Sequence, residues 1–138
     1  MNDRNNAIEI NREKVCPFLI RLFYRENDFN SLEEMNIGRF PSLRELHIYT
    51  WTDASLRELT MLIRDSVDFA KRKEAILNYS FIFPDSKGKY QRKEIGNVHM
   101  YKKGQDDIKT LHQLRFTIGD YIDISIKTVN NNNNINNN

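Results

Sequence analysis

The chain has 138 residues, of which 39% are hydrophobic and 29% are charged. A domain of this length buries roughly two-thirds of the surface that its unfolded chain exposes, which predicts one compact domain. The composition is that of soluble globular proteins, and no apolar stretch approaches the roughly 20 residues that cross a bilayer. The formal net charge is only +2, which is too small to suggest that the whole domain surface binds nucleic acid.

The two ends of the chain differ in composition from the middle. Asparagines are scattered over residues 2–11, and residues 130–138 are asparagine apart from Ile135. Polar tracts of this kind bury too little apolar surface to offset the entropy lost on ordering. We therefore predict a polar N-terminal tail over 1–14, a folded domain over 15–129 and a disordered, asparagine-rich tail over 130–138.

The first element of the folded region is predicted to be a strand over 18–24. Phe18, Ile20 and Leu22 alternate along it, which indicates a strand packed on one face and partly covered on the other. Cys16 lies at the edge of this apolar run and has no basic neighbour that would activate a thiol. It is predicted to be a small buried residue.

Two more strands are predicted before the first long helix. Residues 26–28 have turn chemistry, so a short antiparallel strand is expected over 29–35. Residues 45–51 are rich in strand formers, with Leu46 and Ile48 on one side.

An amphipathic helix follows, which Thr52 or Asp53 is expected to cap. Arg57 is expected on its solvent-exposed face. Its apolar positions recur at helical spacing and form one stripe: Leu56, Leu59, Ile63 and Val67.

A hairpin and a closing strand complete the expected elements. Residues 79–83 and 90–95 are predicted to pair, and residues 96–112 are predicted to be a long loop. The last strand alternates three isoleucines, at 122, 124 and 126, with polar residues. One helix across a mixed sheet predicts an α+β protein of the β-grasp type with one main amphipathic helix.

The residues that could carry chemistry form no recognisable site. His47, His99 and His112 are far apart and lack neighbours at metal-ligand spacing. The chain has neither a nucleophile elbow nor a glycine-rich phosphate loop. We therefore predict that the protein is not an enzyme and needs no metal or cofactor.

Four ordered blocks of sequence resemble one known family, the Sin-three-associated polypeptide of eighteen kilodaltons. They are residues 12–21 (REKVCPFLIR), 45–60 (ELHIYTWTDASLRELT), 93–96 (KEIG) and 116–124 (FTIGDYIDI). The resemblance implies a ubiquitin-like domain and a nuclear, or nuclear and cytoplasmic, adaptor without catalysis. It implies two sets of partners: the Sin-three histone deacetylase co-repressor, and a splicing-associated complex of an Acinus-type protein with a serine-rich RNA-recognition-motif protein.

An adaptor needs a contact surface, which we predict along the second hairpin strand and the long loop, with the tryptophan nearby. An extended partner segment pairing with a sheet edge there would gain backbone hydrogen bonds. Trp51 is equally compatible with packing beneath the helix or a tail. The predicted partner-binding residues are Trp51, Tyr90, Ile95, Gly96, Tyr101, Gly104, Asp106 and Asp107.

An alternative function is weak direct RNA binding by the basic stretch 87–103. Lysines and arginines recur there with Tyr90 and Tyr101 between them. No aromatic motif typical of RNA-recognition domains accompanies the charge, so solvated loop charges, offset by the 19 acidic residues, are the favoured explanation of the pattern.

Overall fold

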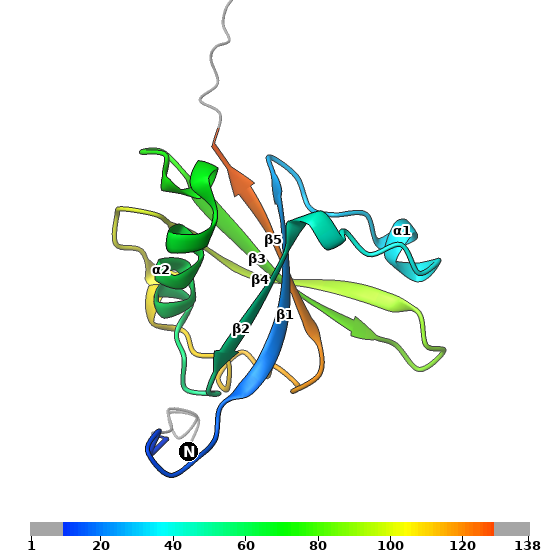
Figure 1. Cartoon of the computed structure of the whole chain (residues 1–138), viewed down its shortest axis with the longest axis horizontal. Helices are drawn as coiled ribbons and strands as arrows, with labels where there is room; N and C mark the ends of the chain where they lie inside the picture. The colour runs from blue at the N-terminus through cyan, green and yellow to red at the C-terminus, as the bar shows by residue number, and fades with distance from the viewer. Residues whose placement is uncertain (1–9, 129–138) are drawn as a thin grey trace, which may run out of the picture.

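The computed structural model describes residues 10–128. In them, five strands form one sheet in the order β2-β1-β5-β3-β4 (Figure 1). Their bounds are Phe18–Glu26 for β1, Glu45–Thr50 for β2, Ile76–Pro84 for β3, Tyr90–His99 for β4 and Tyr121–Lys127 for β5. The predicted tail over 130–138, and the first nine residues of the tail predicted over 1–14, lie outside the described residues.

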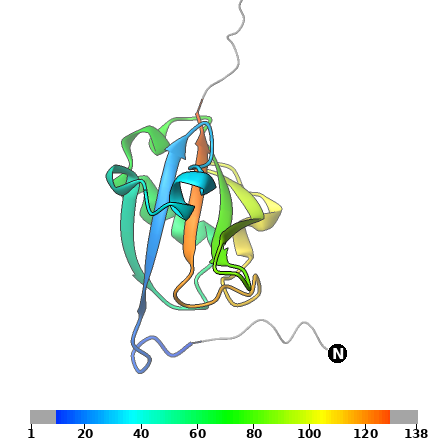
Figure 2. The same ribbon diagram turned by 90° about the vertical axis from the view of Figure 1, so that its right-hand side faces the viewer.

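The sheet is mixed, and one helix dominates its cover. β1 and β5 are parallel, whereas the other three neighbouring pairs are antiparallel. Helix α2 (Leu56–Ser66) and the short helix α1 (Leu32–Asn36) lie on opposite sides of the sheet (Figures 1 and 2). This arrangement confirms the predicted α+β, ubiquitin-like β-grasp fold. None of the helices described is long and apolar enough to span a membrane.

The main core lies between α2 and the sheet. Leu56, Leu59 and Ile63 of α2 are fully buried, as the helical spacing predicts. Because side chains alternate across a strand, the isoleucines of β5 point to this side together with apolar residues of every other strand. Sheet residues of this cluster include Ile20, Leu22, Ile48, Leu77, Tyr79, Ile95, Ile122, Ile124 and Ile126.

The start of α2 differs from the prediction. Ser55 caps the helix, since its Oγ accepts a hydrogen bond from the Glu58 N–H at 3.1 Å. Thr52 and Asp53 lie before the cap, in a turn that the Ala54 N–H closes by donating to the Trp51 carbonyl at 3.0 Å. The carbonyl of Thr52 accepts from the His112 N–H at 2.9 Å. The predicted cap at Thr52 or Asp53 is therefore wrong by two or three residues.

The predicted strand over 29–35 is wrong, because α1 occupies part of this segment. Ser31 caps α1 by accepting from the Glu34 N–H at 3.2 Å, and acidic residues in the first turn suit the positive end of a helix. Cys16 is also not buried as predicted. It is exposed, since it precedes β1 and lies beyond the cover of the sheet.

The predicted hairpin is confirmed as β3 and β4, which pair antiparallel. β4 continues to His99, so the loop predicted over 96–112 begins later than expected. An irregularity in the register between Tyr79 and Ser80 absorbs one residue of β4, and this lets the pairing pass Gly96. The connection that follows contains one 3₁₀ turn, η4 (Gln105–Ile108).

Candidate partner-binding surface

One part of the sheet face opposite α2 is left uncovered, at strands β1 and β2. Leu19 and Tyr49 are register partners there, and 39% and 66% of their surfaces are exposed. Their chain neighbours Ile20 and Ile48 are buried on the α2 side, so alternation places Leu19 and Tyr49 outward. We call Leu19, Arg21, His47 and Tyr49 the open sheet patch.

A carboxylate organises the polar half of the open sheet patch. The Nε of Arg21 donates to Oε2 of Glu45 at 2.6 Å, and Nε2 of His47 lies 2.8 Å from the same oxygen. The hydrogen bond from Arg21 holds the pKa of Glu45 below its usual value, and His47 acts in the same direction. The patch therefore combines exposed apolar side chains with one fixed ion pair, a composition typical of protein interfaces.

Aromatic rings next to the patch fix the position of Arg21. Its guanidinium carbon lies 5.2 Å from the ring centroid of Tyr121 and 5.6 Å from that of Phe23. Phe40 packs on the same group, with its ring centroid 5.3 Å from that of Tyr121. Segment 29–44 thus covers the neighbouring part of this sheet face, and the open sheet patch begins where that cover ends.

The two edges of the sheet differ in how accessible their backbone is. On β4, the Tyr90 N–H donates to Oδ1 of Asn36 at 2.7 Å, and the Asn97 N–H donates to Oδ2 of Asp106 at 2.9 Å. Side chains therefore occupy both ends of the β4 edge. β2 pairs only with β1 among the strands described, so its outer edge is the better template for an added strand.

Six of the eight predicted partner-binding residues meet at one end of β4. Gly96, with φ +150°, lies against Asp106. A Cβ atom at position 96 would lie only 2.7 Å from Oδ2 of Asp106. The Gly104 N–H donates to Oδ2 of Asp107 at 3.1 Å. The hydroxyl of Tyr101 donates to the Lys71 carbonyl, and Ile95 is buried in the main core. Most of these residues therefore hold the loop in place, and Tyr101 is the most exposed apolar one.

Arg57 organises this loop, which sequence reasoning did not foresee. It was expected on the solvent-exposed face of the helix, but its guanidinium donates to the carbonyls of His99, Met100 and Lys102 at 2.8 to 2.9 Å. It also pairs with Asp107 at 3.0 Å. One helical arginine thus fixes the chain direction after β4, and nothing in the helical periodicity distinguishes it from a solvated arginine.

The other two predicted residues lie elsewhere. Tyr90 begins β4 and packs against Phe40 and Tyr121 on the opposite sheet face. Trp51 follows β2, and its Nε1 donates to the Val15 carbonyl at 2.6 Å. The guanidinium of Arg12 lies 4.7 Å from the Trp51 ring centroid. The eight residues therefore form no single surface.

Arg12 itself is held by acidic residues around the start of α2. It pairs with Asp53 at 2.6 Å and with Glu58 at 2.8 Å. These contacts join the end of the predicted tail 1–14 to the domain, whereas the boundary at residue 15 stays a prediction.

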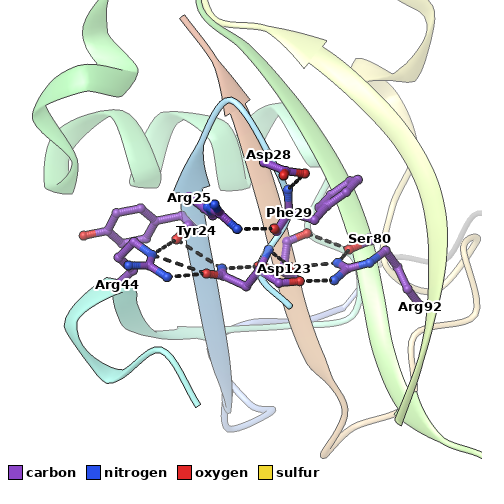
Figure 3. A network of polar contacts seen from close by, with 9 residues as sticks. Tyr24, Arg25, Asp28, Phe29, Arg44, Ser80, Arg92 and Asp123 are labelled. Atoms are coloured by element: carbon purple, nitrogen blue, oxygen red, sulfur yellow. Dashed lines mark hydrogen bonds and ion pairs between the residues drawn. The ribbon is translucent and has the colours of Figure 1, made fainter. Parts of the chain in front are cut away.

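A buried polar network joins segment 29–44 to the sheet, and sequence reasoning also missed it (Figure 3). Asp123, fully buried in β5, pairs with Nη1 of Arg92 at 2.7 Å. It also accepts from the backbone N–H and from Nδ2 of Asn30, at 3.0 and 2.7 Å. The hydroxyl of Ser80 donates to the Asp123 carbonyl at 2.8 Å. This network ties the loop after β1 to the centre of the sheet.

The basic residues of stretch 87–103 do not form one face. Arg92 belongs to the buried network, where its positive charge is compensated by the carboxylate of Asp123. Lys87 and Lys89 lie at the turn before β4, whereas Lys102 and Lys103 follow its far end.

No group of three or more His, Cys, Asp or Glu in residues 10–128 is placed to hold a metal ion.

Comparison with known proteins relates nearly the whole described domain to one family. The family model of Sin3 associated polypeptide p18 (SAP18) matches residues 9–126. Proteins named histone deacetylase complex subunit SAP18 are 44% identical in Homo sapiens and 41% identical in Arabidopsis thaliana, each over 119 residues. These matches cover 85% of this chain and 77% and 78% of the relatives. The Drosophila melanogaster relative is 39% identical over 127 residues, which are 91% of this chain and 84% of that protein. The chain therefore belongs to the Sin3 associated polypeptide p18 family, as the four sequence blocks predict.

Proposed function

We propose that the protein is a non-catalytic adaptor subunit of a nuclear Sin-three histone deacetylase co-repressor complex. The observation that carries this proposal is the 39 to 44% identity, over most of the domain, to proteins named as subunits of histone deacetylase complexes. The relatives are named as subunits and not as enzymes, which supports a binding role. In that role the protein contributes to transcriptional repression by joining the deacetylase to other components.

The same proposal extends to RNA processing. The sequence blocks resemble a family that joins an Acinus-type protein and a serine-rich RNA-recognition-motif protein in splicing-associated complexes. A small domain with two separate contact surfaces can serve two assemblies. In this arrangement any contact with RNA is indirect, through the RNA-binding partner.

We place the main partner contact on the open sheet patch and the adjoining edge of β2. Exposed Leu19 and Tyr49 supply apolar area at the centre, and the Arg21–Glu45 pair supplies polarity beside it. An extended partner segment along β2 would satisfy backbone groups that no described strand pairs. The loop that contains Tyr101 and Gly104 is the second proposed contact, as the sequence predicts.

Affinity purification of the tagged protein from nuclear extract, with nuclease treatment, tests the proposal. We expect stoichiometric recovery of histone deacetylase complex subunits, and of Acinus-type protein in a separate pool. Recovery of nuclease-sensitive material alone would instead support the RNA-binding alternative and contradict the adaptor proposal.

Matched variants locate the contact. We expect Tyr49→Ala combined with Leu19→Ala to reduce partner recovery at least tenfold, because exposed aromatic anchors dominate interface energies. Ile118→Ala removes another exposed apolar side chain and serves as the control.

Ile108→Asp probes the loop at a residue that is 80% exposed. Loss of the partners with Ile108→Asp but not with the β1–β2 variant would move the contact to the loop.

A further inference from the structure

Three arginines line a hollow of about 380 Å³ between the turn after β1 and the segment that leads into β2. They are Arg25, Arg39 and Arg44, and we call the hollow the arginine pocket. Phe40 and Ser31 also line it. None of its lining residues belongs to the open sheet patch or to the loop after β4, so the proposed partner contacts do not account for it.

Arg44 is held in place by neutral acceptors. Its Nη2 donates to Oδ1 of Asn30 at 2.7 Å, and its Nε donates to the Tyr24 carbonyl at 3.2 Å. Arg25 is held in a similar way, since its Nη1 donates to the Phe29 carbonyl at 3.1 Å. Every hydrogen bond that these two side chains donate within residues 10–128 goes to an uncharged oxygen. Their charges are therefore oriented but not neutralised.

The buried network explains why Arg44 points as it does. Asp123 can only accept hydrogen bonds when ionised, so the side-chain amide of Asn30 must present its NH₂ group to Asp123. The amide oxygen of Asn30 then faces Arg44 and accepts from it at 2.7 Å. The negative charge of Asp123 is compensated by Arg92, whose Nη1 lies 2.7 Å from Oδ2 of Asp123. The network thus aims a cation at the pocket without supplying an anion to it.

The charge that lines the pocket is unbalanced. Glu34 is the one carboxylate against three arginines in the lining. Its Oε1 lies 3.9 Å from Nη1 of Arg39, and the two side chains are 52% and 73% exposed. Ion pairs this long and this exposed contribute almost nothing to stability. A positive surplus of two charges remains, which matches a phosphate dianion.

We propose that the arginine pocket binds a phosphorylated serine or threonine side chain of a partner protein. Guanidinium groups recognise phosphate oxygens through paired, charge-assisted hydrogen bonds, and arginine clusters are a recurrent way to read phosphorylated segments. Because Arg25 and Arg44 are already oriented, binding costs less side-chain entropy than it would for free arginines. The inference does not rest on the proposed function, since the pocket can be tested with a short peptide alone.

The test is titration of the ¹⁵N-labelled protein with the peptide acetyl-Gly-Gly-phosphoserine-Gly-Gly-amide, followed by NMR. We expect saturable shifts of the Nε–H resonances of Arg25 and Arg44. The same peptide with glutamate in place of phosphoserine is expected to bind at least tenfold more weakly, and the serine peptide not at all. Equal affinity for the glutamate peptide would overturn the phosphate assignment, and an absence of saturable shifts would overturn the site.

Charge-removing variants separate the pocket from the general field of the protein. Arg25→Gln and Arg39→Gln are each expected to weaken phosphopeptide binding about tenfold, because both side chains are exposed and their loss leaves the core intact. Lys87→Gln removes the same charge at the β3–β4 turn and is expected to change the affinity less than twofold. An equal loss with Lys87→Gln would show that only net charge matters and would contradict the proposal.

Discussion

The two faces of the sheet are buried by different means. On the α2 side, side chains from all five strands and the helix form one apolar cluster, in which a single hydrogen-bonded pair, Tyr79 with Thr60, lies deep inside. On the other side, a small aromatic and methionine cluster adjoins a buried ion pair and an asparagine. The first face buries apolar area without strict direction, whereas the second depends on fixed angles and distances.

The two faces should therefore differ in how well they tolerate substitutions. An apolar cluster accepts changes in shape at a cost that follows the volume removed. A buried ion pair is costly to break because the remaining charge stays in a poorly solvated site. We therefore expect the polar face, although smaller, to be the more sensitive to single substitutions.

The largest expected effect comes from Asp123→Ala. The substitution leaves Arg92 without its carboxylate and removes the acceptor that holds Asn30 of segment 29–44 against the sheet. Breaking one half of a buried ion pair typically costs about 3–5 kcal/mol in the free energy of unfolding. Urea denaturation measures this loss in the free energy of unfolding. Asp65→Ala removes an exposed aspartate as control, and an equal effect of both substitutions would contradict the role of the network.

On the α2 face, Ile63→Ala is expected to lower the free energy of unfolding by about 3 kcal/mol. Ile63 is fully buried, so truncation removes apolar contacts and leaves a cavity. Leu62 is the adjacent residue of the same helix and is 41% exposed, which makes Leu62→Ala the matched control. Similar losses for both variants, measured by the same denaturation, would show that this face is not packed as described.

A smaller effect is expected for the one polar pair inside the apolar cluster. Tyr79→Phe removes a hydroxyl that lies 2.8 Å from Oγ1 of Thr60. Thr60 keeps its bond to the Leu56 carbonyl, so no donor is orphaned and the loss is about 1 kcal/mol. Tyr49→Phe, at an exposed ring, serves as the control. Thermal unfolding of the two variants decides whether the hydroxyl contributes.

The smallest expected effect is a dependence on pH at the open sheet patch. The bond from Arg21 lowers the pKa of Glu45 from its ordinary 4.5. The pair therefore stabilises the fold fully above about pH 4.5, and this contribution is lost as the pH falls through the lowered pKa. Because Arg21 is 40% exposed, we expect less than about 1 kcal/mol. Glu45→Gln should unfold more easily than the parent at pH 7, and the difference between the two should shrink as the pH falls below 4.5. A constant difference between the two proteins would argue against the linkage.

Much of the fold follows from local pattern, and the misses have local causes. The alternation in 18–24 and the stripe Leu56, Leu59, Ile63 each decide an element without reference to the rest of the chain. Segment 29–35 is different, because its turn chemistry fits either a strand or a short capped helix. In the structure Asn30, which directly precedes the cap of α1, is bound to Asp123, a residue 93 positions away that no local pattern could link to this segment.

The candidate surfaces were harder to predict for the same reason. Asp123 is one of the polar residues that alternate with isoleucines in the sequence, and it is buried because Arg92 and Asn30 close over it. Arg57 reads as a solvated helical residue until the loop after β4 folds over it. Conversely, Leu19 and Tyr49 look like core residues, and their exposure depends on how far segment 29–44 extends across the sheet.

The place of β5 has a consequence for how the chain folds during synthesis. The last of the five strands lies between β1 and β3 and is the sole link between the β1–β2 and β3–β4 pairs in the sheet. Both pairs can form as soon as their residues leave the ribosome, but neither can complete its packing on α2 until residues 121–127 emerge. Contacts between distant segments form slowly, so the nascent chain passes through a stage with two unjoined half-sheets. During that stage the edges of β1 and β3 that β5 will join are still unpaired.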